Sequence, residues 1–185
     1  ADITLEHGYV HLQAERLRGA QFVFDKVTVG GTQNVMMAAA LARGTSRLEN
    51  VAREPEVVEL ARVLNKMGAQ ISGAGTPVIE VEGVEQLDGV DHAVMPDRIE
   101  AGTFMVAAAI TGGELELANC RLDDMMAVVD KFRSIGIVVE KAGSGCTVAR
   151  TGSIKPADIT TQPYPGFPTD LQAQFMALLA LAEGN

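Results

Sequence analysis

Apolar residues follow two different periods along this chain, and each period predicts a different element. In residues 57–67 and 125–132 apolar side chains recur at intervals of three and four, which indicates amphipathic helices. The stretches VIEVEG (78–83) and IGIVVE (135–140) alternate between apolar and polar positions instead, as half-buried strands do. The pattern therefore predicts a mixed α/β chain, and it favours core packing over a cofactor site.

Two further stretches are apolar on every side of a helix. They are VMMAAALA (35–42) and MVAAAI (105–110). A helix without a polar face is expected to be buried all round. The helix predicted after the first of them carries charged residues and should be half exposed. This contrast in polarity favours Ala-rich helices sealed between sheets that face solvent.

The sequence also repeats. MAAALARGTSRLEN (37–50) resembles VAAAITGGELELAN (106–119), and a third copy begins in ALLALAEGN (177–185). The glycines expected to end the three buried helices are Gly44, Gly113 and Gly184, at intervals of about 70 residues. A strand, an amphipathic helix and further strand residues follow the first two glycines. A period of this length predicts a complete α/β supersecondary unit that recurs, rather than a small solenoid repeat.

The two ends of the chain fall inside this repeat. The opening ADITLEHGYVHL (1–12) matches the residues that follow the Met-Gly turn at 67–68. The last residues stop just after the third apolar helix. We therefore expect the chain to be a segment of a longer protein, with apolar surface on its third helix left without a partner.

Composition narrows the function classes. The chain has 185 residues, of which 47% are hydrophobic but only 4% aromatic, so the core is expected to be aliphatic. No apolar run approaches the roughly 20 residues of a membrane span, and no signal peptide opens the chain. The formal net charge of −9 argues against nucleic-acid binding and against docking on an anionic membrane. An anionic ligand would need a local positive site.

The cysteines and histidines suggest no metal or redox site. Cys120 and Cys146 form no metal-binding pattern, and we interpret them as buried thiols in a reducing cytoplasm rather than as a disulfide. The histidines His7, His11 and His92 are scattered and lack ligand spacing. They are expected to have surface or structural roles, and no metal is predicted.

Four segments carry a family resemblance. They are FDKVTVGGT (24–32), NVAREPEVVELARVLNKMGA (50–69), MPDRIEAGTFMVAAA (95–109) and PYPGFPTDLQAQF (163–175). Together they resemble the UDP-N-acetylglucosamine enolpyruvyl transferases, along the whole chain and without a large gap. The sister family, enolpyruvyl shikimate phosphate synthase, shares the fold but not these motifs, and it remains an alternative.

The resemblance implies a fold and a division of the chain. The family fold is an inside-out α/β barrel, with two lobes of three repeats each, buried helices and sheets that face solvent. Residues 1–95 would belong to the first, catalytic lobe, and residues 96–185 to the second. The implied fold agrees with the repeat and polarity patterns above.

The resemblance also implies a reaction. The family transfers the enolpyruvyl group of phosphoenolpyruvate to the 3-hydroxyl of UDP-N-acetylglucosamine and releases phosphate, without a cofactor, in the cytoplasm. This is the first committed step of peptidoglycan synthesis. The family's reactive cysteine and its phosphoenolpyruvate-binding lysine and arginines fall outside this chain, so the isolated chain is expected to be inactive. The alternative from another class is a non-catalytic repeat module that kept the fold as a binding domain.

Asp170 is the candidate catalytic residue. It follows a stretch stiffened by Pro163, Pro165 and Pro168, at the start of an apolar helix. From the residues alone, Asp170 reads as a helix cap, a role that Thr169 could equally fill. The resemblance implies instead that Asp170 is the base that takes the proton of the sugar hydroxyl. A rigid approach would then fix the position of the carboxylate.

The stretch DKVTVGGT (25–32) is the candidate substrate-binding site. From the residues alone it reads as a strand-to-helix turn, although its glycines would also let backbone N–H groups approach an anion. It is no Walker loop, because its lysine precedes the glycines. The resemblance implies that a pocket for the uridine diphosphate sugar is lined by Lys26, Val27, Thr28, Val29 and Gly30, and that Asp170 also contacts this substrate.

A second rank of candidates lies in AREPE (52–56) and PDRIE (96–100). These are Glu54, Glu56 and Arg98. Acidic residues in a first helical turn, and Pro55 at an early helical position, favour two helix-start clusters. The resemblance implies instead that both clusters face the cleft between the lobes near the substrate, with Arg98 the better candidate.

Overall fold

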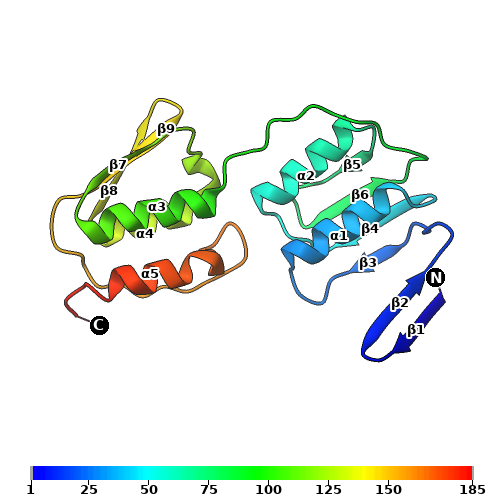
Figure 1. Cartoon of the computed structure of the whole chain (residues 1–185), viewed down its shortest axis with the longest axis horizontal. Coiled ribbons are helices and arrows are strands. Elements are labelled where there is room, and N and C mark those ends of the chain that lie inside the picture. The colour runs from blue at the N-terminus through cyan, green and yellow to red at the C-terminus, as the bar shows by residue number, and fades with distance from the viewer. Residues whose placement is uncertain (1, 185) are drawn as a thin grey trace. The chain divides into compact units, whose positions relative to one another are not determined.

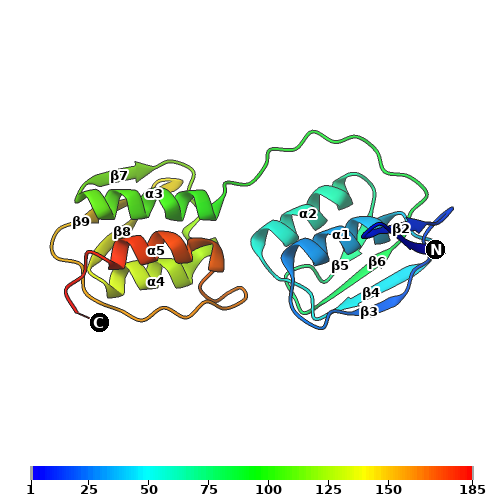
Figure 2. The ribbon, with the colours of Figure 1, turned by 60° about the horizontal axis from the view of Figure 1, so that its bottom comes forward.

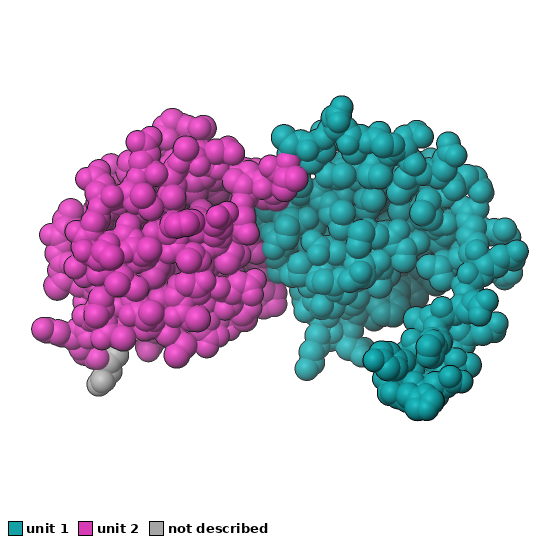
Figure 3. Space-filling model, viewed as in Figure 1, with its two compact units in different colours: residues 1–93 teal, residues 94–185 magenta. Residues whose placement is uncertain are grey.

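The computed structural model describes residues 2–184, and the chain divides into two compact units. Unit 1 covers residues 1–93 and unit 2 covers residues 94–185 (Figure 3). Each unit has its own hydrophobic core.

Unit 1 is a sheet with two helices on one side (Figures 1 and 2). Its elements are β1 (Asp2–Glu6), β2 (Tyr9–Gln13), β3 (Gln21–Val23), α1 (Val29–Ala40), β4 (Thr45–Glu49), α2 (Pro55–Lys66), β5 (Gln70–Ser72) and β6 (Val78–Glu82). The four-stranded sheet has the order β3-β4-β6-β5. Strands β3 and β4 are parallel, and the other neighbours are antiparallel.

Unit 2 has a three-stranded sheet, which lacks a counterpart of β3 within the described residues, and one more helix than unit 1. Its elements are α3 (Arg98–Thr111), β7 (Glu114–Leu117), the 3₁₀ turn η1 (Leu122–Met125), α4 (Met126–Ser134), β8 (Ile137–Ala142), β9 (Gly145–Arg150), the 3₁₀ turn η2 (Thr169–Leu171) and α5 (Gln172–Leu179). The antiparallel sheet has the order β7-β9-β8. Helix α5 packs beside α3 (Figure 2).

The repeat predicted from the sequence is present in the structure. The series α1-β4-α2-β5-β6 in unit 1 recurs in unit 2 as α3-β7-α4-β8-β9. Equivalent positions also share a backbone conformation, because Asn50 and Asn119 both have positive φ angles, of 56° and 55°. Non-glycine residues rarely adopt this conformation, and asparagine tolerates it better than most. The two Asn residues thus mark the same turn after the first strand of each copy.

The strand alternation places apolar side chains against the helices. In β6, Ile79 and Val81 are fully buried while Glu80 and Glu82 point to solvent. The amphipathic helix α2 turns its own buried side chains, such as Val57, into the same core. One face of each sheet is therefore apolar and covered, and the other faces solvent, as expected for outward-facing sheets.

The expectation that the Ala-rich helices are buried on every face is wrong for this chain. On α1, Met36 is fully buried but Met37 is 42% exposed. On α3, Phe104 is 50% exposed, and on α5 Met176 is 65% exposed. The reason is that each unit, taken by itself, packs one sheet and its neighbouring helices against one side of these helices. The other side keeps its apolar side chains in solvent, as expected for the third helix.

The helix ends also differ from the expectation. The residue that caps α3 in the left-handed conformation is Gly112, with φ 69°, rather than Gly113. Helix α1 ends at Ala40 with Leu41 as its C-cap residue, and Gly44 instead forms the turn into β4 with φ 82°. Helix α5 ends before Gly184. The three helices end at Ala40, Thr111 and Leu179, so the expected glycines lie four, two and five residues beyond the helix ends, too far to cap them directly.

Strands β1 and β2 form a two-stranded ribbon of their own (Figure 1). Ile3 pairs with Leu12, and Leu5 pairs with Val10. Directly opposed residues of an antiparallel pair point to the same face, so these four side chains make one face apolar. All four are at least 60% exposed.

The two cysteines are free and buried, which confirms their interpretation as buried thiols. Burial raises the pKa of the Cys146 thiol to about 12, and burial also raises the pKa of Cys120. Because the thiolate is the reactive form, both groups are poor nucleophiles at neutral pH. Within residues 2–184, no helix has the length and apolarity needed to cross a bilayer.

Candidate functional site

The two candidate segments of unit 1 leave the same edge of its sheet. Because β3 and β4 are parallel, with Val23 opposite Glu49, the loops that follow them begin side by side. The first loop contains Lys26 and leads to α1. The second contains Glu54 and leads to α2. The fold thus brings together two motifs that are separated in the sequence.

Side-chain hydrogen bonds join these two loops. The Thr32 hydroxyl donates to the carbonyl oxygen of Thr28 at 2.7 Å and accepts from the backbone N–H of Ala52 at 3.0 Å. The Asn50 amide donates to the carbonyl oxygen of Phe24 at 2.7 Å. Thr32 is fully buried, so its bonds are shielded from water. The sequence analysis missed both residues, although the shared Asn of the two repeats is a signal for the turn at position 50.

Thr32→Val is expected to destabilise unit 1 by about 1–3 kcal/mol, because the buried N–H of Ala52 loses its acceptor. Urea denaturation of the 185-residue chain measures this loss. Thr111→Val is the matched control, since the Thr111 hydroxyl is exposed and bonds only within its own helix. An unchanged free energy of unfolding in Thr32→Val would show that the bond between the loops contributes nothing.

The N-terminus of α1 has the features of an anion site. Thr28 is its N-cap, and its hydroxyl accepts from the N–H of Gly31 at 3.3 Å. The N–H groups of Val29 and Gly30, in the first turn, have no acceptor inside the helix. Apart from its chain neighbours and the nearby backbone of its own helix, no described atom lies within 4 Å of the place where a Cβ of residue 30 would be. A ligand can therefore approach this backbone closely, at the positive end of the helix dipole.

Lys26 and Val27 add a charge and an apolar surface to this turn. Both side chains are exposed, Val27 at 38%. The Lys26 ammonium group has no hydrogen-bond or ion-pair partner among residues 2–184, so its charge is available to a ligand. The strand-to-helix turn expected from the residues is confirmed, since β3 ends at Val23 and α1 begins at Val29. The role in substrate binding stays a prediction.

The AREPE motif forms the start of α2, as the helix-start interpretation predicted. Pro55 is the first helical residue, and Glu56 lies in the first turn. Glu54 is the N-cap residue, but its side chain makes no capping bond. It is 7% exposed, and its Oε2 atom has no hydrogen-bond partner in the described part of the chain. A contact of Glu54 or Glu56 with substrate stays a prediction.

The capping interpretation of Asp170 is wrong. Asp170 lies inside the turn η2, which the N–H of Leu171 closes on the carbonyl oxygen of Pro168 at 3.3 Å. The cap position is thus occupied by Pro168, whose side chain has no acceptor, and neither Thr169 nor Asp170 makes a capping bond. The Asp170 side chain is exposed, and it has no hydrogen-bond or ion-pair partner within residues 2–184.

The proline-rich loop before Asp170 is held at several points. The N–H of Gly166 donates to the carbonyl oxygen of Pro163 at 2.9 Å, which closes a tight turn. Phe167 is 5% exposed and lies in the core of unit 2. The guanidinium carbon of Arg98 lies 5.7 Å from the centre of the Tyr164 ring, a cation–π distance. Arg98 therefore lies beside the loop that leads to Asp170.

The PDRIE motif forms the start of α3. The Asp97 carboxylate accepts from the N–H groups of Ile99 and Glu100, at 2.7 and 3.2 Å, and so caps the helix. Arg98 is the first helical residue and is 9% exposed. The helix-start interpretation is confirmed here too, and a contact of Arg98 with substrate stays a prediction.

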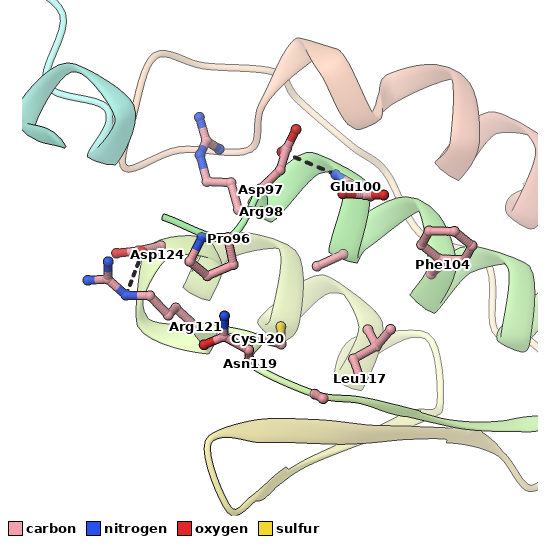
Figure 4. A pocket seen from close by; sticks show the side chains of 12 residues that line it. Pro96, Asp97, Arg98, Glu100, Phe104, Leu117, Asn119, Cys120, Arg121 and Asp124 are labelled. Carbon is pink, nitrogen blue, oxygen red and sulfur yellow. Dashed lines mark hydrogen bonds and ion pairs between the residues drawn. The ribbon is translucent and has the colours of Figure 1, made fainter. Parts of the chain in front are cut away.

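Arg98 also lines a cavity of about 190 Å³ in unit 2 (Figure 4). The cavity lies between the first turns of α3 and the segment from the end of β7 to η1. Arg121, in its wall, forms an ion pair with Asp124 at 3.1 Å. Among residues 2–184, no three His, Cys, Asp or Glu side chains are grouped to hold a metal ion.

The predicted site residues therefore form two groups. Lys26 and its neighbours lie beside the Glu54 loop in unit 1, while Arg98 lies beside the loop before Asp170 in unit 2.

Comparison with solved structures defines the class of fold. The crystal structure of the enolpyruvyl transferase NikO from Streptomyces tendae matches 99% of this chain and 47% of that chain, with a TM-score of 0.82 at 24% identity. An EPSP synthase from Acinetobacter baumannii matches 100% of this chain and 44% of that chain, with a TM-score of 0.62 at 22% identity. The expected fold of the enolpyruvyl transferase type is confirmed.

A family model described as EPSP synthase (3-phosphoshikimate 1-carboxyvinyltransferase) matches residues 1–185. The chain belongs to this family of enolpyruvyl transferases. It is 56% identical to the UDP-N-acetylglucosamine 1-carboxyvinyltransferases of Solidesulfovibrio magneticus and Sorangium cellulosum, and 54% identical to that of Geotalea daltonii. Each comparison covers the whole chain but 44% of the relative, so the chain spans less than half the length of these curated relatives. The resemblance to UDP-N-acetylglucosamine enolpyruvyl transferases is thereby confirmed.

Proposed function

We propose that this chain is part of an enzyme that transfers the enolpyruvyl group of phosphoenolpyruvate to the 3-hydroxyl of UDP-N-acetylglucosamine. The reaction releases inorganic phosphate and would be the first committed step of peptidoglycan synthesis, in the cytoplasm. The observation that carries the proposal is the 54–56% identity, over the whole chain, to proteins named for this activity. The structural likeness to an EPSP synthase, at 22% identity, supports the fold alone.

In the proposed site, the start of α1 binds the sugar nucleotide. The Lys26 ammonium and the first N–H groups of the helix face the negative diphosphate, while Val27 offers an apolar surface. Thr28, Val29 and Gly30 complete this side of the proposed pocket. The exposed, unpaired Lys26 and the open backbone at Gly30 support this assignment. Since the whole chain has a net charge of −9, an anionic ligand needs such a local site.

Asp170 acts in the proposed reaction as the general base. The carboxylate takes the proton of the 3-hydroxyl as its oxygen bonds to C2 of phosphoenolpyruvate, whose methylene carbon gains a proton from an acid outside this chain. Loss of phosphate and of one methyl proton from the resulting tetrahedral intermediate then restores the double bond. An exposed carboxylate on a stiff turn suits this role, because it is accessible and fixed in position. Arg98, Glu54 and Glu56 are proposed as secondary contacts.

Phosphate release tests the proposed reaction. A full-length protein that carries this chain is expected to release phosphate from phosphoenolpyruvate in the presence of UDP-N-acetylglucosamine, and not with shikimate 3-phosphate. Turnover with shikimate 3-phosphate would instead identify the sister activity. The absence of turnover with either acceptor, in a folded protein, would favour the binding module.

Lys26→Met is expected to raise the KM for UDP-N-acetylglucosamine about 10- to 100-fold with a small change in kcat, since a hydrogen bond to a charged group is lost. Lys66→Met is the matched control, because Lys66 lies on α2 and bonds to His92 at 3.2 Å. Steady-state kinetics with varied sugar nucleotide measure both variants. An unchanged KM in Lys26→Met would remove Lys26 from the site.

A further inference from the structure

The position of Asp170 is set by its neighbours. Its own side chain forms no hydrogen bond or ion pair within residues 2–184, so nothing at the carboxylate itself holds the turn in place. Leu171, the next residue, is fully buried in the core of unit 2. The anchor of the turn is therefore one residue beyond the carboxylate.

Leu171 sits in a notch on α3 that exists because residue 102 is glycine. A Cβ atom at position 102 would lie 2.6 Å from Cδ1 and 3.0 Å from Cδ2 of Leu171. Real Cβ atoms do not come so close to carbon, and Leu171 is enclosed on all sides. Glycine in a helix interior costs about 0.5–1 kcal/mol relative to alanine, so its presence at this contact needs a compensating reason.

A hydrogen bond beside the notch holds the same segment. The Gln174 side-chain amide donates to the Thr103 hydroxyl at 3.0 Å, and that hydroxyl donates to the carbonyl oxygen of Ile99 at 2.8 Å. Since the only proton of the hydroxyl is used toward Ile99, it can only accept from Gln174. Adjacent residues of α3, Gly102 and Thr103, thus contact the segment directly after Asp170.

We propose that Gly102 is a positioning residue for Asp170. The notch at Gly102 lets the turn η2 pack directly against α3, and this close approach fixes where the carboxylate stands. The proposal rests on the proposed function, in which Asp170 is the base. Gly102 acts only through Leu171 and touches no substrate.

The test combines a filled notch with a smaller neighbour, in a full-length protein that carries this chain. Gly102→Ala is expected to lower kcat about 10- to 100-fold, because small displacements of a catalytic group are costly, while the KM for UDP-N-acetylglucosamine stays within about twofold. Leu171→Val removes the Cδ atoms that the new Cβ would meet. The double variant is therefore expected to recover most of the kcat lost in Gly102→Ala.

Ala109→Val is the matched control, since Ala109 is fully buried on the same helix, two turns further along. It adds volume to the same core and is expected to lower the melting temperature without a comparable loss of kcat. Full activity of Gly102→Ala would overturn the proposal. So would a folded double variant that stays as slow as the single one. If Gly102→Ala fails to fold, the kcat of the double variant is compared with that of Leu171→Val. A near-normal kcat in the double variant and a lower kcat in Leu171→Val would support the proposal. A double variant slower than Leu171→Val would overturn it.

The assignment of Asp170 as the base is tested independently of the role of Gly102. If Asp170→Asn turns over normally, the proposed base is wrong whatever the Gly102 variants do. If Asp170→Asn is inactive and Gly102→Ala is fully active, only the positioning role is lost.

Discussion

Asp170→Asn, in a full-length protein that carries this chain, is expected to lower kcat about 10²- to 10⁴-fold, because the attacking hydroxyl loses its general base. Asparagine keeps the size and the hydrogen-bonding shape of the side chain but cannot take a proton at neutral pH. The KM for UDP-N-acetylglucosamine should change little, since the diphosphate contacts lie elsewhere in the proposed site. Phosphate release under saturating substrates measures kcat directly.

The asparagine variant also separates the base from a structural role. Asn and Asp are about equally good helix caps, so a residue that only capped α5 would tolerate the exchange. The structure already excludes a capping bond from Asp170. Thr169→Ala is the control on the same turn and should retain near-normal kcat. If kcat of Asp170→Asn stayed within a few-fold of the parent protein, the base would have to be sought elsewhere.

Phe175→Ala is expected to lower the free energy of unfolding of unit 2 by about 3–5 kcal/mol, the usual cost of truncating a buried phenylalanine. Phe175 is fully buried, with its ring centre 4.7 Å from that of Phe132 and 4.9 Å from that of Phe167. The chain holds six phenylalanines, and three of them meet here. The truncation therefore leaves a cavity beside the buried rings of Phe132 and Phe167.

Phe104→Ala is the control for this measurement, since Phe104 is 50% exposed on α3. Its truncation should cost less than about 1 kcal/mol. Urea denaturation of the 185-residue chain, followed through amide signals of unit 2, measures both variants. Equal effects of the two truncations would mean that the three rings do not form the structural centre of unit 2.

Much of the fold was predictable because the two periods are clear in the sequence. The alternation in VIEVEG predicted β6, and the three- and four-residue spacing after Pro55 predicted α2. The internal repeat supplied the order of the elements without any knowledge of their contacts. Such signals are local, and they come from the same side chains that form the core.

Burial of the Ala-rich helices could not be predicted in the same way. Apolar composition indicates that a helix face favours burial, but a helix is buried on every face only if packed layers cover both of its sides. Each unit, described by itself, covers one side. Met37 and Phe104 are therefore exposed although their helices are apolar. The position of the left-handed cap also depends on the helix end, which composition places only to within a residue or two.

The parts of the candidate site that have a sequence motif could be predicted. The parts that depend on packing between distant residues could not. The bend at Lys26 and the turn before Asp170 were visible as proline and glycine patterns. The bond from Thr32 to the next loop, and the notch at Gly102, join residues that are distant in sequence and have no motif of their own. The parallel pairing of β3 and β4, which brings the loops of Lys26 and Glu54 together, is likewise a property of the sheet.

The ribbon of β1 and β2 has a consequence for how the chain behaves in solution. Its outer edges are open rows of amides and carbonyls, and its apolar face is unpaired with any helix of the described residues. The net charge of −9 keeps neighbouring molecules apart, and added salt weakens that repulsion. At high protein concentration, added salt is therefore expected to favour association of the ribbons of different molecules, which light scattering at two ionic strengths would detect.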